Sequence, residues 1–136
     1  MARPWRLAKS LHTLREQVDK AYPQRKKTHD GTIGDAAHAS RPSDHNPNIM
    51  DDIHGVVSAL DITHDPKHCD AHALAENLRT TKDPRIKYII SNARICSPPG
   101  FAWRKYTGSN PHKSHIHISV KGDKRHYDSM ARWVLP

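Results

Sequence analysis

The chain has 136 residues, of which 35% are hydrophobic; its formal net charge is +8 and its mean hydropathy is −0.84. This length suits one domain with a modest core beneath extensive polar loops. The sequence contains no apolar run long enough to span a membrane, and its basic N-terminus lacks the apolar stretch of a secretory signal. We therefore expect a protein made in the cytoplasm without a signal peptide, with no stable membrane insertion. Its positive charge favours an anionic partner, either nucleic acid or the acidic polymers of a cell wall.

The N-terminal segment, residues 1–22, is predicted to be a helix. Its apolar residues recur at spacings of four, three and four, which puts them on one helical face: Leu7, Leu11, Leu14 and Val18. Ser10 is a candidate N-cap, and Tyr22 followed by Pro23 should end the helix. The face is expected to pack this helix on the core.

Residues 23–55 are predicted to form a long loop region, because turn-forming Gly, Pro, Asp, Asn and Ser are frequent there. A loop this long in a small domain is usually functional or disordered. It carries four histidines, namely His29, His38, His45 and His54. The histidine content favours a functional loop.

Residues 56–136 are predicted to form the sheet core. The expected elements are a buried strand at 56–63, a helix from Asp65-Pro66 to Arg79, a hairpin of 86–90 and 94–96 turning at Ser91-Asn92, a strand at 114–120 and a short terminal helix at 126–135. The second helix should bury a stripe made by Ala71, Leu74, Ala75 and Leu78. Together these elements predict a small single-domain α+β fold, mainly antiparallel sheet with flanking helices.

Two segments of the predicted sheet carry polar groups where a core is expected. His115 and His117 would project from one face of their strand, about 7 Å apart, while Ile116 and Ile118 face the core. Asp61 lies within an apolar strand, where an unpaired carboxylate is costly to bury. Each residue has a structural interpretation and a functional one, and the functional one is a metal or acid–base site.

Three short patterns occur in a fixed order: Ser43-Asp44-His45, Ala59-Leu60-Asp61 and His115-Ile116-His117. This series resembles the S-x-H, A-x-D and H-x-H elements of the zinc D-alanyl-D-alanine carboxypeptidases and L-alanyl-D-glutamate endopeptidases, in a branch found in actinobacteria and their phages. The resemblance covers roughly residues 30–120. It implies a fold similar to that of Hedgehog proteins and D-Ala-D-Ala peptidases.

The resemblance also implies roles for single residues. His45, Asp61 and His117 would bind Zn²⁺, His115 would act at the transition state or in proton transfer, and Ser43 would lie near the substrate. Arg41 is the nearest candidate in sequence for a cation that contacts the substrate carbonyl.

The sequence departs from the family pattern at two points. Many members have seven residues from the first His to the Asp, and here His54 rather than His45 stands seven before Asp61. The serine context favours His45 as the first ligand, and the spacing favours His54. Ser114 also stands where some endopeptidase members have an acidic residue, which leaves His115 as the proton-handling candidate.

The resulting hypothesis is a monomeric zinc metallopeptidase that hydrolyses peptidoglycan stem peptides and does not act on nucleic acid. A phage endolysin reaching the bacterial cell wall through a membrane-pore partner fits best. The residues leave open a metal-dependent phosphoesterase or nuclease, and a non-catalytic zinc-containing wall-binding module. They also leave open which peptidoglycan bond is cut.

Overall fold

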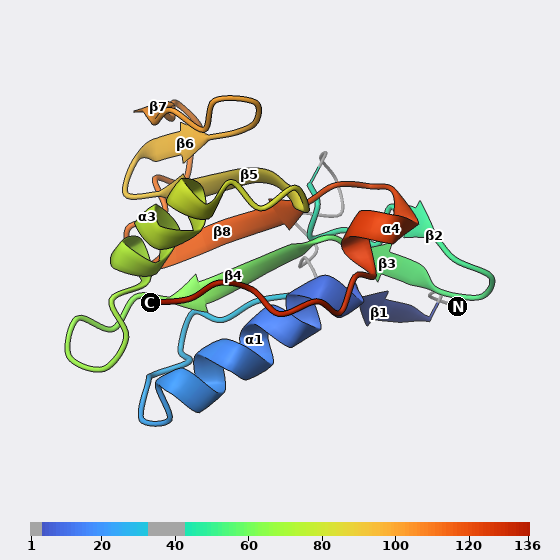
Figure 1. The fold of residues 1–136 in the computed structure, drawn as a ribbon, viewed down its shortest axis with the longest axis horizontal. Helices are drawn as coiled ribbons and strands as arrows, with labels where there is room; N and C mark the ends of the chain where they lie inside the picture. The colour runs from blue at the N-terminus through green and yellow to red at the C-terminus, as the bar shows by residue number, and fades with distance from the viewer. Residues whose placement is uncertain (1–3, 33–42) are drawn as a thin grey trace.

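The structure is a computed structural model that describes residues 4–32 and 43–136. These residues form a small α+β domain with two sheets (Figure 1). The strands are β1 Trp5–Leu7, β2 Ile49–Met50, β3 Gly55–Val57, β4 Ala59–Thr63, β5 Ile86–Ser91, β6 Arg94–Cys96, β7 Arg104–Lys105 and β8 His115–Val120. The helices are α1 Lys9–Ala21, α3 Ala71–Thr81 and α4 Lys124–Tyr127. Within this described part, no helix combines the length and apolar character needed to cross a bilayer.

The larger sheet is antiparallel throughout and has the strand order β4-β8-β5-β6-β7. The smaller sheet has the order β1-β3-β2, with β1 parallel and β2 antiparallel to β3. The predicted strand at 56–63 is therefore two strands that belong to different sheets. The chain changes sheets at Ser58, whose N–H donates to Asp44 O (3.2 Å) and whose carbonyl accepts from Val120 N (2.9 Å).

The register of the larger sheet separates an apolar face from a polar face. Leu60 is paired with Ile118 and Ile62 with Ile116, and these four side chains are fully buried. Successive side chains on a strand point to opposite faces, so the pair Asp61 and His117 lies on the other face of the same two strands. The predicted alternation of His and Ile in β8 is confirmed.

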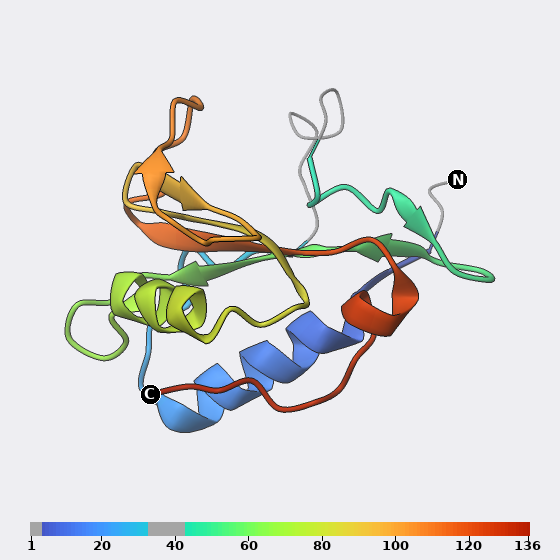
Figure 2. The same ribbon diagram turned by 45° about the horizontal axis from the view of Figure 1, so that its top comes forward.

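The helices cover the apolar face (Figure 2). Helix α1 buries the part of the predicted stripe from Leu11 to Val18, whereas Leu7 lies in β1 and is partly buried. Helix α3 buries all four of its predicted stripe residues. Burial of Leu-sized side chains stabilises the fold by about 1.5–3 kcal/mol each. The loop that follows residue 43 lies over the opposite face of the sheet.

The predicted helix starts are wrong at both long helices. Ala8, not Ser10, is the N-cap of α1, because Ala8 N still donates to Val57 O (2.9 Å) as a continuation of β1 pairing. Helix α3 begins at Ala71, since Asp65 instead pairs with Cys69 in a short bridge and accepts a hydrogen bond from Lys26 N (3.1 Å). Asp70 takes the capping role through Ala73 N (3.0 Å).

The predicted hairpin is present, but it turns one residue later than expected. Ser91 remains in β5, paired with Arg94, and Asn92 and Ala93 both have positive φ values (50° and 64°). Two successive left-handed residues make the tight turn whose twist matches that of paired strands. Asn is among the residues that tolerate this conformation best.

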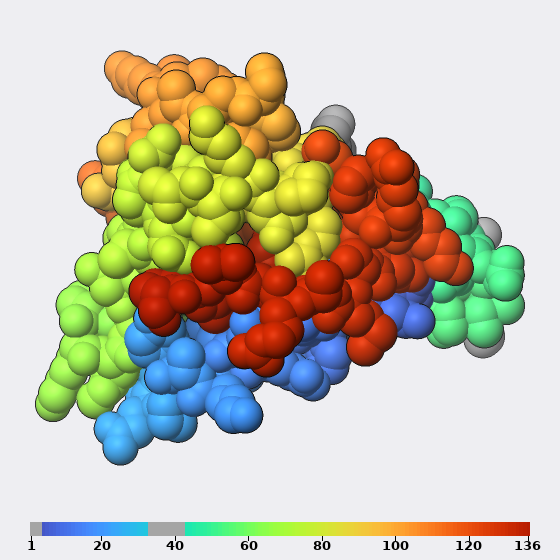
Figure 3. Space-filling model, viewed as in Figure 1, coloured from blue at the N-terminus to red at the C-terminus, as the bar shows by residue number. Residues whose placement is uncertain are grey.

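The C-terminal segment is not the predicted helix beyond Tyr127. It runs as an extended chain over the groove between α1 and α3 (Figure 3). Gln17 binds both backbone groups of Trp133, with its amide donating to the carbonyl (3.0 Å) and its oxygen accepting from the N–H (2.8 Å). Asn77 donates to Val134 O (2.9 Å). Helix side chains thus take the backbone groups that a terminal helix would have paired internally.

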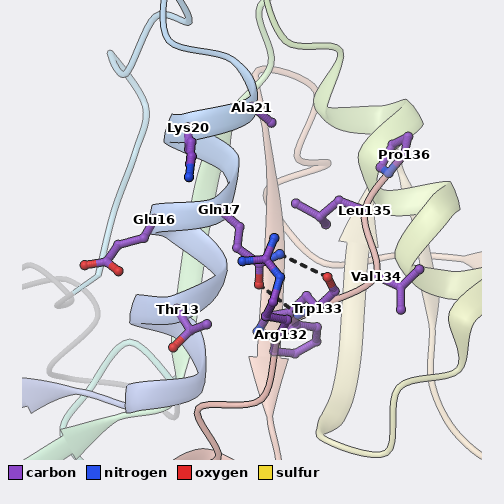
Figure 4. A pocket seen from close by; sticks show the side chains of 10 residues that line it. All are labelled: Thr13, Glu16, Gln17, Lys20, Ala21, Arg132, Trp133, Val134, Leu135 and Pro136. Carbon is purple, nitrogen blue, oxygen red and sulfur yellow. Dashed lines mark hydrogen bonds between the residues drawn. The ribbon is translucent and has the colours of Figure 1, made fainter.

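A cavity of about 620 Å³ lies between α1 and this C-terminal segment (Figure 4). Trp133 is one of the residues that line it; its indole N–H donates to Ser10 O (2.9 Å), and the Arg85 guanidinium lies 3.8 Å from its ring centroid. The cavity is on the helical side of the sheet. It is therefore separate from the polar face that carries Asp61 and His117.

Candidate metal centre

Three segments far apart in sequence meet on the polar face of the sheet. Asp61 and His117 come from the adjacent central strands β4 and β8, and His45 comes from the turn that follows residue 43. His45 and His117 are buried, and Asp61 is partly buried between them. Strand pairing positions Asp61 and His117, and loop contacts position His45.

The ligand-type atoms of these three residues converge on one carboxylate oxygen. Asp61 Oδ1 lies 3.1 Å from His45 Nε2 and 3.3 Å from His117 Nδ1. All three ligand atoms lie within 4.8 Å of one another. Two tetrahedral ligand atoms that are each about 2.0–2.1 Å from a zinc ion are roughly 3.3 Å apart. These residues therefore have the spacing and the chemistry to hold a metal ion.

The second nitrogen of each imidazole is held by a protein oxygen. His45 Nδ1 lies 2.7 Å from Thr32 O, a carbonyl that can only accept, so Nδ1 donates to it. Nε2 lies 3.1 Å from Asp61 Oδ1 and becomes a metal ligand when the proton it donates to that oxygen is released. His117 Nε2 lies 2.8 Å from Ser119 Oγ. Metal-binding histidines nearly always have such outer partners, which orient the ring. These contacts leave the nitrogens nearest Asp61 able to act as ligands.

Local turn chemistry places His45. Its backbone N–H donates to Ser43 Oγ (3.1 Å), the short side-chain-to-backbone bond by which Ser stabilises turns. Lys87 Nζ from β5 lies 3.0 Å from Asp44 Oδ2, which holds the same turn over the sheet. One bond within the turn and one ion pair to β5 therefore hold the segment from Ser43 to His45.

The charges of the cluster support one another. Burial alone would raise the pKa of Asp61, but the hydrogen bonds and charges of His117 and His45 hold it below its usual range. Burial opposes protonation of His45, yet the hydrogen bond and charge of Asp61 raise its pKa above the usual value. Asp61 is thus an ionised acceptor surrounded by imidazole rings.

Two further histidines adjoin the cluster. His115 Nε2 lies 3.6 Å from Asp61 Oδ2, and the His112 ring centroid lies 4.8 Å from that of His115. Burial is the main cause that lowers the pKa of both rings, that of His112 to about 4. Both imidazoles are therefore neutral near pH 7.

The cluster lines an open cleft of about 440 Å³. The ring of Tyr88 stacks on His117, with centroids 5.2 Å apart, and burial raises the pKa of Tyr88 to about 12. Tyr106 lines the same cleft, whereas Trp103 packs against the core and donates to Glu76 (3.0 Å). Of the two aromatics in the segment 103–106, only Tyr106 is on the cleft wall.

The other predicted site residues are placed as follows. Ser43 lines the cleft, with its hydroxyl engaged by His45 N. His54 lies apart from the cluster, 3.6 Å from Asp51, so the structure brings His45 and not His54 to Asp61. Arg41 lies outside the described residues.

Sequence reasoning missed His112 and Tyr88. His112 had a signal, because it is the first of three histidines in the six residues 112–117. Tyr88 had none, since a Tyr in an apolar strand is ordinary core composition.

Comparisons of this chain with models of protein families, with curated proteins and with solved structures found no match.

Proposed function

We propose that the chain is a zinc-dependent peptidase that hydrolyses peptidoglycan stem peptides, with a fold like that of D-Ala-D-Ala peptidases and Hedgehog proteins. One observation carries the proposal: the three motifs that resemble this family meet, with His45 and His117 within 3.3 Å of one Asp61 oxygen. A chance likeness in three separate segments would not require their side chains to meet. The convergence therefore supports the resemblance independently of the sequence pattern.

His45, Asp61 and His117 would hold the ion. When bound, zinc polarises a carbonyl and makes a coordinated water acidic enough to attack it near neutral pH. All three proposed ligands line the open cleft, which supports a catalytic zinc site with an open position rather than a closed structural one.

His115 is the residue proposed to move protons. It lies two residues from His117 on the same face of β8, half-buried in the cleft wall, with Nε2 facing the centre. A neutral imidazole there can accept a proton at Nε2 and deliver it to the nitrogen of the departing amine. A positioned group of this kind contributes about 10²–10⁴-fold to the rate.

The substrate proposal rests on the cleft and on charge. The rings of Tyr88 and Tyr106 offer apolar faces to an extended peptide, and Ser43 lines the same wall. Stem peptides carry carboxylates, and the chain has a formal net charge of +8. We propose that the protein works as a monomeric cell-wall lytic enzyme of the endolysin type, with Arg41 as a further substrate contact.

The test is mass analysis of soluble fragments from purified peptidoglycan, incubated with the protein before and after chelation. We expect cleavage at one stem-peptide bond that stops on chelation and returns with added zinc, and the fragment masses identify the bond. His117→Ala should be inactive, and the exposed helix residue His12→Ala should be active.

Three results would contradict the proposal. Cleavage that persists after complete removal of metal would exclude a metallopeptidase. Chelator-sensitive cleavage of DNA without cleavage of peptidoglycan would establish a phosphoesterase or nuclease. Bound zinc without any fragments would establish a non-catalytic binding module.

A further inference from the structure

The two oxygens of Asp61 have different histidine neighbours. Oδ1 is the atom near His45 and His117, whereas Oδ2 lies 3.6 Å from His115 Nε2. Asp61, His112 and His115 form a second group whose ligand-type atoms lie within 4.8 Å of one another. A carboxylate can use its two oxygens for two cations at once.

His112 is built to present one nitrogen to this second group. Its Nδ1 lies 2.7 Å from Asn110 O, so Nδ1 donates to that carbonyl and Nε2 keeps its lone pair. His115 follows the same pattern, with Nδ1 3.3 Å from Ser114 Oγ and Nε2 toward Asp61. Each ring thus has an outer partner at Nδ1, which leaves Nε2 as the nitrogen that can bind a metal ion.

The backbone of His112 has an unfavourable conformation. Its φ is +55°, a region that non-glycine residues enter at a cost of about 1–3 kcal/mol. Asn110 Oδ1 accepts from its N–H (2.9 Å), and its carbonyl accepts from Asn92 N (2.9 Å). Such strain persists only where surrounding contacts impose it, and it is frequent at ligand sites.

We propose that Asp61 Oδ2, His112 and His115 form a second divalent-cation site, with Asp61 bridging the two ions. The inference rests on the proposed function in one respect, because it makes His115, the proposed proton-transfer residue, a metal ligand in the same cleft. Two imidazoles and a shared carboxylate suit zinc, cobalt and nickel.

The second ion should bind more weakly than the first and should inhibit the peptidase. It shares a carboxylate already neutralised by the first ion, and His115 is only half-buried at the cleft wall. An occupied second site holds His115 Nε2 as a ligand, so that atom can no longer accept a proton. One equivalent of zinc therefore activates, and excess zinc removes the contribution of His115, about 10²–10⁴-fold.

The test is the zinc stoichiometry of the metal-free full chain, measured by calorimetric titration and by metal analysis of the protein after gel filtration. Wild type should bind one zinc tightly and a second more weakly. His112→Asn removes the ligand nitrogen while Asn tolerates the left-handed backbone. It should keep the tight site, and it should weaken the other by more than the ~10–100-fold that losing an outer partner costs. His12→Asn, on exposed α1, should keep both.

The outcomes separate this inference from the proposed function. One zinc per wild-type chain, or two in both wild type and His112→Asn with unchanged affinities, would overturn the second site. Two ions with loss of the weak one in His112→Asn would support it even if peptidoglycan were not cut. Inhibition by excess zinc that is equal in wild type and His112→Asn would overturn the proposed role of the second ion.

Discussion

Asp30 and Asp61 are both partly buried carboxylates, Asp61 within β4 and Asp30 bonded to Thr63 of β4, yet they have different kinds of partner. Asp30 is paired with Arg25, whose guanidinium is fully buried (2.7 and 3.0 Å), and it accepts from Thr63 N and Oγ1 (2.9 and 2.8 Å). Asp61 forms an isolated β-bridge with Gly31, the residue after Asp30, and its carboxylate is surrounded by imidazoles. The two kinds of partner differ in whether they can release a proton near neutral pH.

An arginine cannot release its proton near neutral pH, so the Arg25–Asp30 pair is permanent and structural. An imidazole can exchange its proton for a metal ion, so the partners of Asp61 can become ligands alongside it. The comparison indicates that a buried carboxylate is a candidate metal ligand when its partners can exchange a proton for a metal ion. The Arg25–Asp30 pair instead holds the loop that follows α1, and this loop brings Thr32 to His45.

The largest effect is expected for Asp61→Asn. The substitution should abolish tight zinc binding and reduce peptidase activity by more than the ~10²–10⁴-fold that losing a positioned acid or base costs. In zinc at 100 times its dissociation constant, wild type should gain about 2.7 kcal/mol in the free energy of unfolding and the variant nothing. Urea denaturation with and without zinc measures this gain.

The metal-free proteins provide the control for that variant. Without zinc, Asp61→Asn should change the free energy of unfolding by less than about 1 kcal/mol, because the neighbouring imidazoles can release their protons. A loss of several kcal/mol in the metal-free state would show that Asp61 is a structural residue of the same kind as Asp30.

Asp30→Asn should give the reverse result. It leaves the buried Arg25 charge with Asp19 as its remaining carboxylate, so the free energy of unfolding should fall by about 3 kcal/mol. Zinc should still stabilise whatever fraction folds. Asp52→Asn, at an exposed position, is the matched control and should change stability by less than about 0.5 kcal/mol. An Asp30→Asn chain as stable as the control would contradict the structural role.

The smallest effect concerns acid pH. Burial alone would raise the pKa of Asp30, but the hydrogen bond and charge of Arg25 and the bonds from Thr63 lower it. Below about pH 4, the usual aspartate pKa, the unfolded chain binds this proton first, so stability falls as the pH falls. The stability difference between wild type and Asp30→Asn should therefore shrink from pH 5 to pH 3. A difference that stays constant would show that the Asp30 charge does not stabilise the fold.

The apolar faces of the main elements were predictable because they follow local periodicity. The stripes of α1 and α3 and the alternation of β8 needed only the spacing of Leu, Ala and Ile. The ends of elements were predicted less well. Ala8 starts α1 because β1 pairs with β3, and the chain after Tyr127 stays extended because Gln17 and Asn77 bind it. These are contacts between distant segments.

The site was predictable where it lies in regular strands. Asp61 and His117 could be assigned to one face from alternation, but their direct pairing depends on the β4–β8 register. The choice between His45 and His54 could not be made from spacing, because the path of the loop decides which imidazole reaches Asp61. His112 was missed since its position depends on a left-handed turn held by Asn110 and Asn92.

The sequence by itself determined the α+β composition, the buried stripes and the residue types able to bind a metal, because these depend on side-chain chemistry and short-range periodicity. Only the tertiary structure decided that His45 lies against Asp61, that the two oxygens of Asp61 have different histidine neighbours, and that the C-terminus is extended. Those features depend on strand register and on loops anchored by distant side chains. Such contacts leave no periodic signal along the chain.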